Sequence, residues 1–240
     1  MRSIHDNLQA VRERIAYAAA AAGRDPAAVT LLAVSKTHPA APVEQALVAG
    51  QRAFGENYVR EATGKMDALA GSLGKERARA LEWHLIGPLQ SNKTRPVAER
   101  FDWVHTVESE KVARRLSEQR PVGMVPLNVL IQVNVSGEAS KSGISPAEAA
   151  GLAAAIAPLS GLKLRGLMAI PEPTADTGLQ RSRFSEVRRL MEDLRRLGFE
   201  LDTLSMGMSD DMEAAIAEGA TMVRVGTAIF GARQKIRSAA

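Results

Sequence analysis

Eight short apolar segments, each followed by a stretch of helical character, constrain the fold of this chain more than any other feature. They begin near residues 31, 52, 82, 102, 127, 162, 203 and 221. Regular alternation of strands and helices predicts parallel strands joined by crossover helices. Eight such units in 240 residues predict an α/β fold of the (β/α)8 TIM barrel type, which typically takes about 250 residues. A doubly wound sheet is the second candidate, but it normally contains fewer strands.

The rest of the chain is expected to be organised as one unit around these segments. Apolar residues recur at helical spacing over residues 3–22, and Gly23 follows as a helix cap. We therefore expect residues 1–25 to form an extra N-terminal helix packed on the barrel. No linker-like stretch is present, so residues 1–240 are expected to form a single domain. The polar residues 71–80 predict a mobile loop, and residues 227–235 predict a final helical turn or two.

Composition argues against several classes of protein. The chain has no cysteine, which excludes disulfides and thiolate metal sites and fits a reducing compartment; we expect no metal site. The net charge of +4 comes from scattered arginines, and aromatic residues make up only 4%, so nucleic-acid binding is not expected. No run of about 18 apolar residues predicts a membrane helix. We expect a cytoplasmic protein that contacts neither membrane nor nucleic acid.

Lys36 follows the first apolar segment, at the end of a strand where barrel proteins place their chemistry. Strand alternation puts Lys36 on the same face as Leu32 and Val34. In a dry environment the charged form of a lysine is disfavoured, so its pKa falls and it reacts more readily with aldehydes. The structural alternative is a lysine whose stem is buried and whose ammonium reaches water. This stretch alone leaves both interpretations open.

The last two strand ends have the residues of a phosphate site. Barrels commonly hold a phosphate in the loops after strands seven and eight, where this chain has Ser205, Gly207, Gly226 and Thr227. Glycine lets an anion approach backbone N–H groups, and hydroxyls add donors. Each motif alone would also fit a helix cap or a turn. Together with an aldehyde-reactive lysine, they predict a site for pyridoxal 5′-phosphate (PLP), an aldehyde that carries a phosphate.

Arg224 is expected to point into the same barrel mouth, because it shares the alternation of Met222 and Gly226. There it would face the pyridine nitrogen of the cofactor, and its high pKa would keep that nitrogen unprotonated. The alternative is a structural ion pair with Glu213 or Glu218. We favour the ligand role.

Several segments occur together in the order that is typical of one known family. They are AVSKT (33–37), FGENY (54–58), WHLIGPLQSNK (83–93), QVNV (132–135), SKSG (140–143), RGLM (165–168), SMGMSDD (205–211) and RVGTAIFG (224–231). With these segments the chain closely resembles the YggS/PROSC family, the pyridoxal phosphate homeostasis proteins. The resemblance runs from about residue 29 to the end of the chain.

The resemblance implies a barrel like the N-terminal domain of alanine racemase, with PLP held as a Schiff base on Lys36. It implies phosphate contacts from the last two strand ends and a place for Asn57 near the cofactor. His38 stands where many relatives have a second lysine, so the resemblance does not extend to any role of that lysine in cofactor transfer. The residues expected to bind the cofactor are Lys36, Asn57, Ser205, Gly207, Arg224, Gly226 and Thr227.

Two functions are compatible with these residues: a PLP carrier without turnover, and a racemase-like enzyme acting on amino acids. Racemisation needs a base on each face of the cofactor, and Lys36 supplies only one. Alanine racemase-like enzymes take the other, a tyrosine, from a partner subunit and carry a second domain, for which this chain leaves no room after strand eight. Tyr17 and Tyr58 are not evident second bases, and His84 stays open. We therefore expect no catalytic residues, and a monomer that buffers PLP and delivers it to apo-enzymes.

Overall fold

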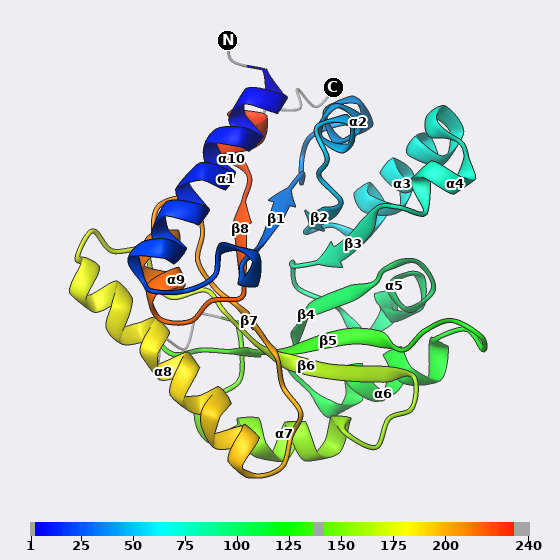
Figure 1. The fold of residues 1–240 in the computed structure, drawn as a ribbon. Helices are drawn as coiled ribbons and strands as arrows, with labels where there is room; N and C mark the ends of the chain where they lie inside the picture. Colours follow the sequence, from blue (N-terminus) through cyan, green and yellow to red (C-terminus); the bar gives the residue numbers. More distant parts are fainter. Residues whose placement is uncertain (1–2, 137–141, 233–240) are drawn as a thin grey trace, which may run out of the picture.

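Eight parallel strands close into a barrel in the order of the sequence, so that β1 pairs with both β2 and β8 (Figure 1). The structure, a computed structural model, describes residues 3–136 and 142–232. The predicted (β/α)8 barrel is confirmed. Its strands are β1 (Thr30–Val34), β2 (Ala53–Glu56), β3 (Glu82–Leu85), β4 (Trp103–Val107), β5 (Leu127–Val133), β6 (Leu162–Ala169), β7 (Thr203–Ser205) and β8 (Met222–Val225).

Helices form the outer layer around the strands (Figure 1). Short 3-10 turns stand at Pro26–Ala28, Ser91–Lys93 and Pro146–Glu148. The α-helices are α1 (Ile4–Ala21), α2 (Ala40–Val48), α3 (Val59–Leu73), α4 (Lys75–Ala78), α5 (Thr94–Arg100), α6 (Glu110–Gln119), α7 (Ala149–Ile156), α8 (Thr177–Arg196), α9 (Met212–Ala217) and α10 (Thr227–Phe230).

The segment expected to be a loop over residues 71–80 is largely helical, and that prediction is wrong. Helix α3 continues to Leu73 because its apolar face, with Ala62, Met66 and Leu69, is buried against the barrel. Gly74 then ends the helix at a φ of 78°, and α4 follows directly. Tertiary burial of one helix face thus overrides the polar composition of the segment. The final helix ends at Phe230, and residues 233–235 of the expected turn lie outside the described residues, as do Ser140 and Lys141.

Helix α1 packs on the outside of the barrel against the helices that follow β7 and β8. Its buried face includes Leu8, Val11 and Ile15, and it contacts α9 and α10. Asn7 Nδ2 donates to the Ile229 carbonyl at 2.9 Å, and Arg14 pairs with Glu213 at 2.7 Å. The start of the chain therefore supports the two units that end at the barrel mouth.

Strand alternation separates the barrel interior from the layer between strands and helices. On β1, Leu31 and Ala33 belong to the large core beneath the helices, whereas Leu32 and Val34 belong to a smaller interior cluster with Ala53, Ile86 and Met222. A second interior cluster consists of Trp103, Leu130 and Met168. The interior also contains buried polar side chains, among them His84, His105, Ser205 and Arg224.

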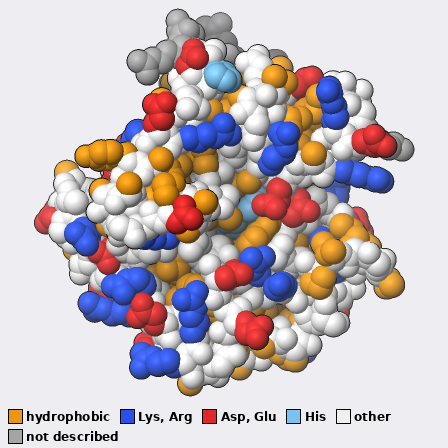
Figure 2. All heavy atoms as spheres, in the orientation of Figure 1, with side chains coloured by type: hydrophobic (Ala, Val, Ile, Leu, Met, Phe, Trp, Pro, Cys, Tyr) orange, Lys and Arg blue, Asp and Glu red, His pale blue; other side chains and the backbone are white. Residues whose placement is uncertain are grey.

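Charged side chains of both signs are interspersed over the surface seen in Figure 2, without one dominant basic patch. This distribution agrees with the scattered arginines of the sequence. Within residues 3–136 and 142–232, no helix combines the length and apolar character needed to cross a membrane.

Candidate functional site

A cavity of about 420 Å³ opens at the carboxyl ends of the strands, where the sequence predicts the site. Five of the predicted residues line it: Lys36, Asn57, Arg224, Gly226 and Thr227. The remaining lining residues are Val34, Ile86, Ile170, Met208, Ser209 and Asp210. Residues from both ends of the chain meet here because β1 pairs with β8.

Lys36 lies two residues beyond the end of β1 and is half-buried. The ladder continues just past the strand, since Ser35 N donates to the Gly55 carbonyl at 3.0 Å. The preceding Val34 lines the same cavity and Leu32 lies deeper in the barrel, as the alternation predicts. His38 does not line this cavity, and its ring lies 5.3 Å from the ring of Phe230.

A buried lysine holds the backbone on the N-terminal side of Lys36. Lys65 Nζ donates to the Ser35 carbonyl at 2.8 Å and forms an ion pair with Glu56. Ser35 Oγ donates to the same Glu56 carboxylate at 2.6 Å. Burial raises the pKa of Glu56, and the Lys65 ammonium opposes that rise. The ion pair and the hydroxyl therefore fix Ser35 from both its carbonyl and its side chain.

The residue on the other side of Lys36 is held as well. Thr37 has a φ of 65°, a conformation that few non-glycine residues adopt. Its N–H donates to Glu61 Oε1 at 2.6 Å, and the same oxygen accepts from Lys65 Nζ at 3.3 Å. Ser35 and Thr37, the two neighbours of Lys36, are thus hydrogen-bonded to the same network of Lys65, Glu56 and Glu61. This network fixes the backbone from which the Lys36 side chain extends.

The loops after β7 and β8 contribute two hydroxyls, Ser209 and Thr227, to one side of the cavity. Gly226 permits a close approach there, because a Cβ at this position would lie 3.0 Å from the Val34 carbonyl oxygen. Gly207 does not line the cavity; its φ of 94° turns the chain against α9, where a Cβ would lie 2.5 Å from Ala215 Cβ. The exposed Asp210 also borders this side.

Arg224 is buried and donates to the Ser205 carbonyl at 2.6 Å, to Ser205 Oγ at 2.7 Å and to the Ala169 carbonyl at 2.8 Å. Burial lowers its pKa to about 10, and Asp211 opposes that shift, so the guanidinium is charged at neutral pH. Arg224 forms no ion pair with Glu213 or Glu218, because Glu213 pairs with Arg14, and Glu218 pairs with Arg181 and Arg188.

Ser205 lies beneath Arg224 rather than in the cavity lining. It is fully buried, and its hydroxyl contacts both Arg224 Nη1 and His105 Nδ1, the latter at 2.9 Å. Burial, together with the charges of His84 and Arg224, holds the pKa of His105 well below its usual 6.5. Ser205 therefore supports the side chain of Arg224 from below. The register of β4, β7 and β8 brings His105, Ser205 and Arg224 together.

The side chains around the cavity fit the predicted cofactor. Lys36 offers an amine for the aldehyde, Arg224 a cation for the ring nitrogen, and Ser209 and Thr227 hydroxyls for the phosphate. Asn57 Oδ1 is buried and has no hydrogen-bond partner among the described residues. A buried acceptor without a partner is costly, and a donor on a bound ligand would satisfy it.

Comparison with known proteins identifies the family. The model for "Alanine racemase, N-terminal domain" matches residues 7–234. The "Pyridoxal phosphate homeostasis protein" of Pseudomonas aeruginosa is 61% identical over 233 residues, which cover 97% of each chain. The Escherichia coli protein of the same name is 54% identical, over 97% of this chain and 98% of its own. This chain belongs to the YggS/PROSC family of pyridoxal phosphate homeostasis proteins.

A solved member of the YggS/PROSC family has the same fold. PipY from Synechococcus elongatus, with PLP bound, is 36% identical and superposes with a TM-score of 0.82. The match covers 95% of this chain and 100% of PipY. The barrel architecture is therefore shared along nearly the whole chain.

Sequence reasoning missed the residues behind the cavity, above all Lys65, Glu56 and His105. One local signal was available, because Lys65 lies within the apolar face of α3, between Ala62 and Met66. A lysine on a buried helix face needs a partner. No local pattern indicates that His105 and Ser205 meet, because they are 100 residues apart.

We predict that Lys65→Met lowers the free energy of unfolding by about 3–5 kcal/mol, because it leaves the buried Glu56 carboxylate without its partner. Adding Glu56→Gln should recover most of the loss, since the amide still accepts from Ser35. Urea denaturation of both variants measures this, with the exposed Lys111→Met on α6 as the matched control. A double variant as unstable as the single one would show that the two side chains are not coupled.

The buried His105 should make the stability of the folded protein depend on pH. Because the folded protein disfavours protonated His105, the unfolded chain binds that proton first as pH falls below about 6.5. The free energy of unfolding should then fall by up to about 1.4 kcal/mol per pH unit from this one group. Urea denaturation at several pH values between about 7.5 and about 5.5 measures this free energy. It should change less with pH in His105→Gln than in the exposed control His5→Gln. Parallel pH curves for both variants would contradict the neutral assignment of His105.

Proposed function

We propose that this protein binds PLP in the cavity at the barrel mouth and takes part in PLP homeostasis by holding and releasing it. One observation carries the proposal: Lys36 and Arg224, brought together from opposite ends of the chain, line one cavity with the hydroxyls of Ser209 and Thr227. The 61% identity to a protein named for PLP homeostasis supports it.

Each residue of the cavity has a proposed part in holding the cofactor. When bound, PLP supplies an aldehyde that condenses reversibly with an amine. Lys36 Nζ is the proposed amine of this Schiff base. The backbone at Gly226 and the hydroxyls of Ser209 and Thr227 receive the phosphate, and Arg224 faces the ring nitrogen. Asn57 Oδ1 accepts a hydrogen bond from the cofactor.

Ser205 and Gly207, the other two expected ligands, act through Arg224. The Gly207 carbonyl accepts from Arg224 N at 2.9 Å, and Ser205 accepts from the guanidinium. Together they place both the backbone and the side chain of the arginine. Their effect on cofactor binding is therefore indirect in this proposal.

The surroundings of the cavity favour a carrier over an amino-acid racemase. The cavity adjoins a second hollow of about 330 Å³, and Asn57 and Ile86 line both. Thr106, Gln132 and Ser142 border this second hollow. None of the described side chains that line this hollow is a carboxylate, histidine, lysine or tyrosine that could act as a general base. The hollow instead leaves room for an incoming amine that competes with Lys36.

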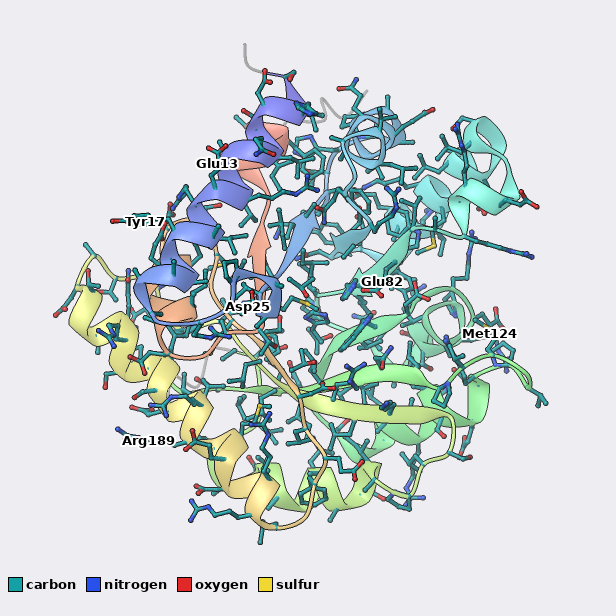
Figure 3. The ribbon with its side chains drawn as sticks, viewed as in Figure 1. Glu13, Tyr17, Asp25, Glu82, Met124 and Arg189 are labelled. Carbon is teal, nitrogen blue, oxygen red and sulfur yellow. The ribbon has the colours of Figure 1, made fainter. Side chains whose placement is uncertain are left out.

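The three candidates for a second base lie elsewhere. Tyr17 projects from the outer side of α1 (Figure 3), and Tyr58 is exposed beside a different hollow with Arg60 and Lys93. His84 is fully buried and bonded to Glu82 and His105. We therefore propose a carrier without catalytic residues, with the racemase-like enzyme as the alternative that the second experiment below tests.

We further propose how the carrier is organised and where it acts. Residues 1–240 act as one cofactor-binding domain, with α1 supporting the two units that form the phosphate side. The protein works in the cytoplasm as a monomer, and PLP-dependent apo-enzymes receive the cofactor through the open mouth. The absence of cysteine from the sequence suits the reducing compartment.

We predict that Lys36→Ala abolishes the absorbance band of the bound cofactor and the label that borohydride fixes on the protein. The matched control is Lys93→Ala, which removes an exposed lysine from the rim of the neighbouring hollow. Lys141 and Lys235, two lysines expected at this end of the barrel, lie outside the described residues. A full-strength label that peptide mass spectrometry maps to a lysine other than Lys36 would refute the assignment.

Deuterium exchange distinguishes the carrier from the racemase. Loaded protein incubated with L-amino acids in D2O should exchange its cofactor without placing deuterium at the α-carbon. None of Tyr17, Tyr58 and His84 lines the cavity, and the one carboxylate that lines it among the described residues, Asp210, is exposed to solvent. Transfer of PLP to an apo-enzyme should proceed in parallel. Lys36-dependent incorporation at a rate near the enzyme median of about 10 s⁻¹ would establish the racemase-like alternative.

A further inference from the structure

A continuous line of hydrogen bonds crosses the barrel interior through β3, β4, β7 and β8. His84 Nε2 lies 2.7 Å from Glu82 Oε1, and His84 Nδ1 lies 2.9 Å from His105 Nε2. His105 Nδ1 lies 2.9 Å from Ser205 Oγ, which accepts from Arg224 Nη1 at 2.7 Å. Both ring nitrogens of His84 and both ring nitrogens of His105 therefore take part in hydrogen bonds.

The line joins the two ends of the barrel. Glu82 is the first residue of β3 and its side chain is 46% exposed, whereas Arg224 lines the cavity at the opposite end of the strands. His84, His105 and Ser205 between them are fully buried. Figure 3 shows Glu82 among the strands rather than on the outer helices.

Packing fixes the orientation of the two rings. His84 stacks on Trp103 with centroids 5.4 Å apart and planes 8° apart, and it meets His105 edge-on at 72°. The Arg165 guanidinium lies 4.8 Å from the Trp103 centroid and pairs with Asp202. Neither ring can turn without disturbing this stack.

The chemistry of the two ends gives the line a direction. A carboxylate only accepts and an arginine only donates, so His84 Nε2 must carry a hydrogen toward Glu82. If both rings are neutral, His84 Nδ1 is bare and accepts from His105 Nε2–H. His105 Nδ1 is then bare as well and accepts the hydroxyl hydrogen of Ser205. Only one arrangement of hydrogens satisfies every bond.

Uptake of one proton reverses the direction beyond His84. His84 then carries hydrogens on both nitrogens, His105 carries its single hydrogen on Nδ1, and that hydrogen points at Ser205 Oγ. The hydroxyl hydrogen must turn to another acceptor, while Oγ accepts from both His105 and Arg224. One proton is gained, none is released, and the hydrogen bonding at Arg224 changes.

The charged groups around the line favour the neutral arrangement at His105. The groups that face it are Glu82 and His84 from β3, Asp102 beside β4, Arg165 from β6, Asp211 before α9 and Arg224 from β8. Burial and the charges of His84 and Arg224 hold the pKa of His105 low, and the hydrogen bond from His84 lowers the pKa of Glu82. The Glu82 carboxylate lies 2.7 Å from His84 Nε2, at the end of the line away from Arg224.

We propose that Glu82, His84, His105 and Ser205 are positioning residues that form a relay. The relay orients Arg224 and couples its hydrogen bonding to the protonation state at the amino-terminal end of the barrel. Its effect on the ring nitrogen of PLP rests on the proposed function, but the relay itself is a property of the unloaded protein.

The first test reads the histidine tautomers by imidazole ¹⁵N–¹H NMR in the unloaded protein. The chain has only four histidines. We expect His105 in the Nε2–H form at neutral pH, and the neutral form of His84 to carry its hydrogen on Nε2 as well. Glu82→Gln replaces a group that only accepts by one that also donates, so the Nδ1–H form of His105 should become populated. Glu110→Gln makes the same chemical change on an exposed carboxylate of α6 and should leave both rings unchanged.

Either of two results would overturn the relay. One is a neutral Nδ1–H form of His84 or His105 in the unsubstituted protein. The other is an unchanged His105 in a folded Glu82→Gln variant, because His105 contacts Glu82 only through His84. Ser205→Ala tests the line from the other end and should shift the His105 Nδ1 resonance, whereas Thr94→Val, which removes a buried hydroxyl of α5, should not.

The second test follows the absorbance of the loaded protein against pH. Glu82→Gln should move the midpoint of the pH-dependent change in the cofactor band, and Glu110→Gln should not. An unmoved midpoint in a variant that still loads through Lys36 would refute the coupling to the cofactor and leave the proposed function standing. Failure of the Lys36 labelling experiment would refute the function, and the tautomers would still decide the relay.

Discussion

The pairing of β1 with β8 closes the barrel, and every group at the mouth depends on it. In this register Leu32 lies opposite Arg224 and Ala33 lies opposite Val225, so the ends of the two strands are adjacent. Lys36 and Arg224, which are far apart in the sequence, thereby line one cavity. Gly226 makes the closure possible at the mouth, because a Cβ there would press on the Val34 carbonyl.

Lys36 and Arg224 are each held by a separate set of buried polar groups. The backbone around Lys36 is attached to Lys65, Glu56 and Glu61, and the guanidinium of Arg224 is attached to Ser205 and His105. Burying such groups is costly unless every donor finds an acceptor. These hydrogen bonds hold the backbone around Lys36 and the guanidinium of Arg224 in place, although Glu56 Oε2 and Thr37 Oγ1 have no hydrogen-bond partner among the described residues.

The relation to alanine racemase-like barrels lies in the shared fold, whereas the chemistry depends on what surrounds the lysine. A racemase needs two bases, and the cavity of this family member combines one lysine with an arginine that stays charged beside it. The described residues of the adjoining hollow include no titratable side chain, an arrangement that suits exchange of one amine for another. The same barrel mouth can therefore serve a carrier, since reversible condensation requires only the lysine and an open path to it.

Local patterns in the sequence were sufficient for the strands, for the inward face of Lys36 and Arg224, and for the glycine-containing turns, because each depends on alternation or turn chemistry over a few residues. They were insufficient for residues 71–80, where burial of Leu69 and its neighbours extends α3. They gave no indication that the Ser205 hydroxyl contacts both Arg224 and His105, because these residues come from three different strands. The contacts of Lys65 with the Ser35 carbonyl and of His105 with Ser205 were decided only by tertiary structure, because helix docking and strand register bring together residues that lie 30 and 100 positions apart in the sequence.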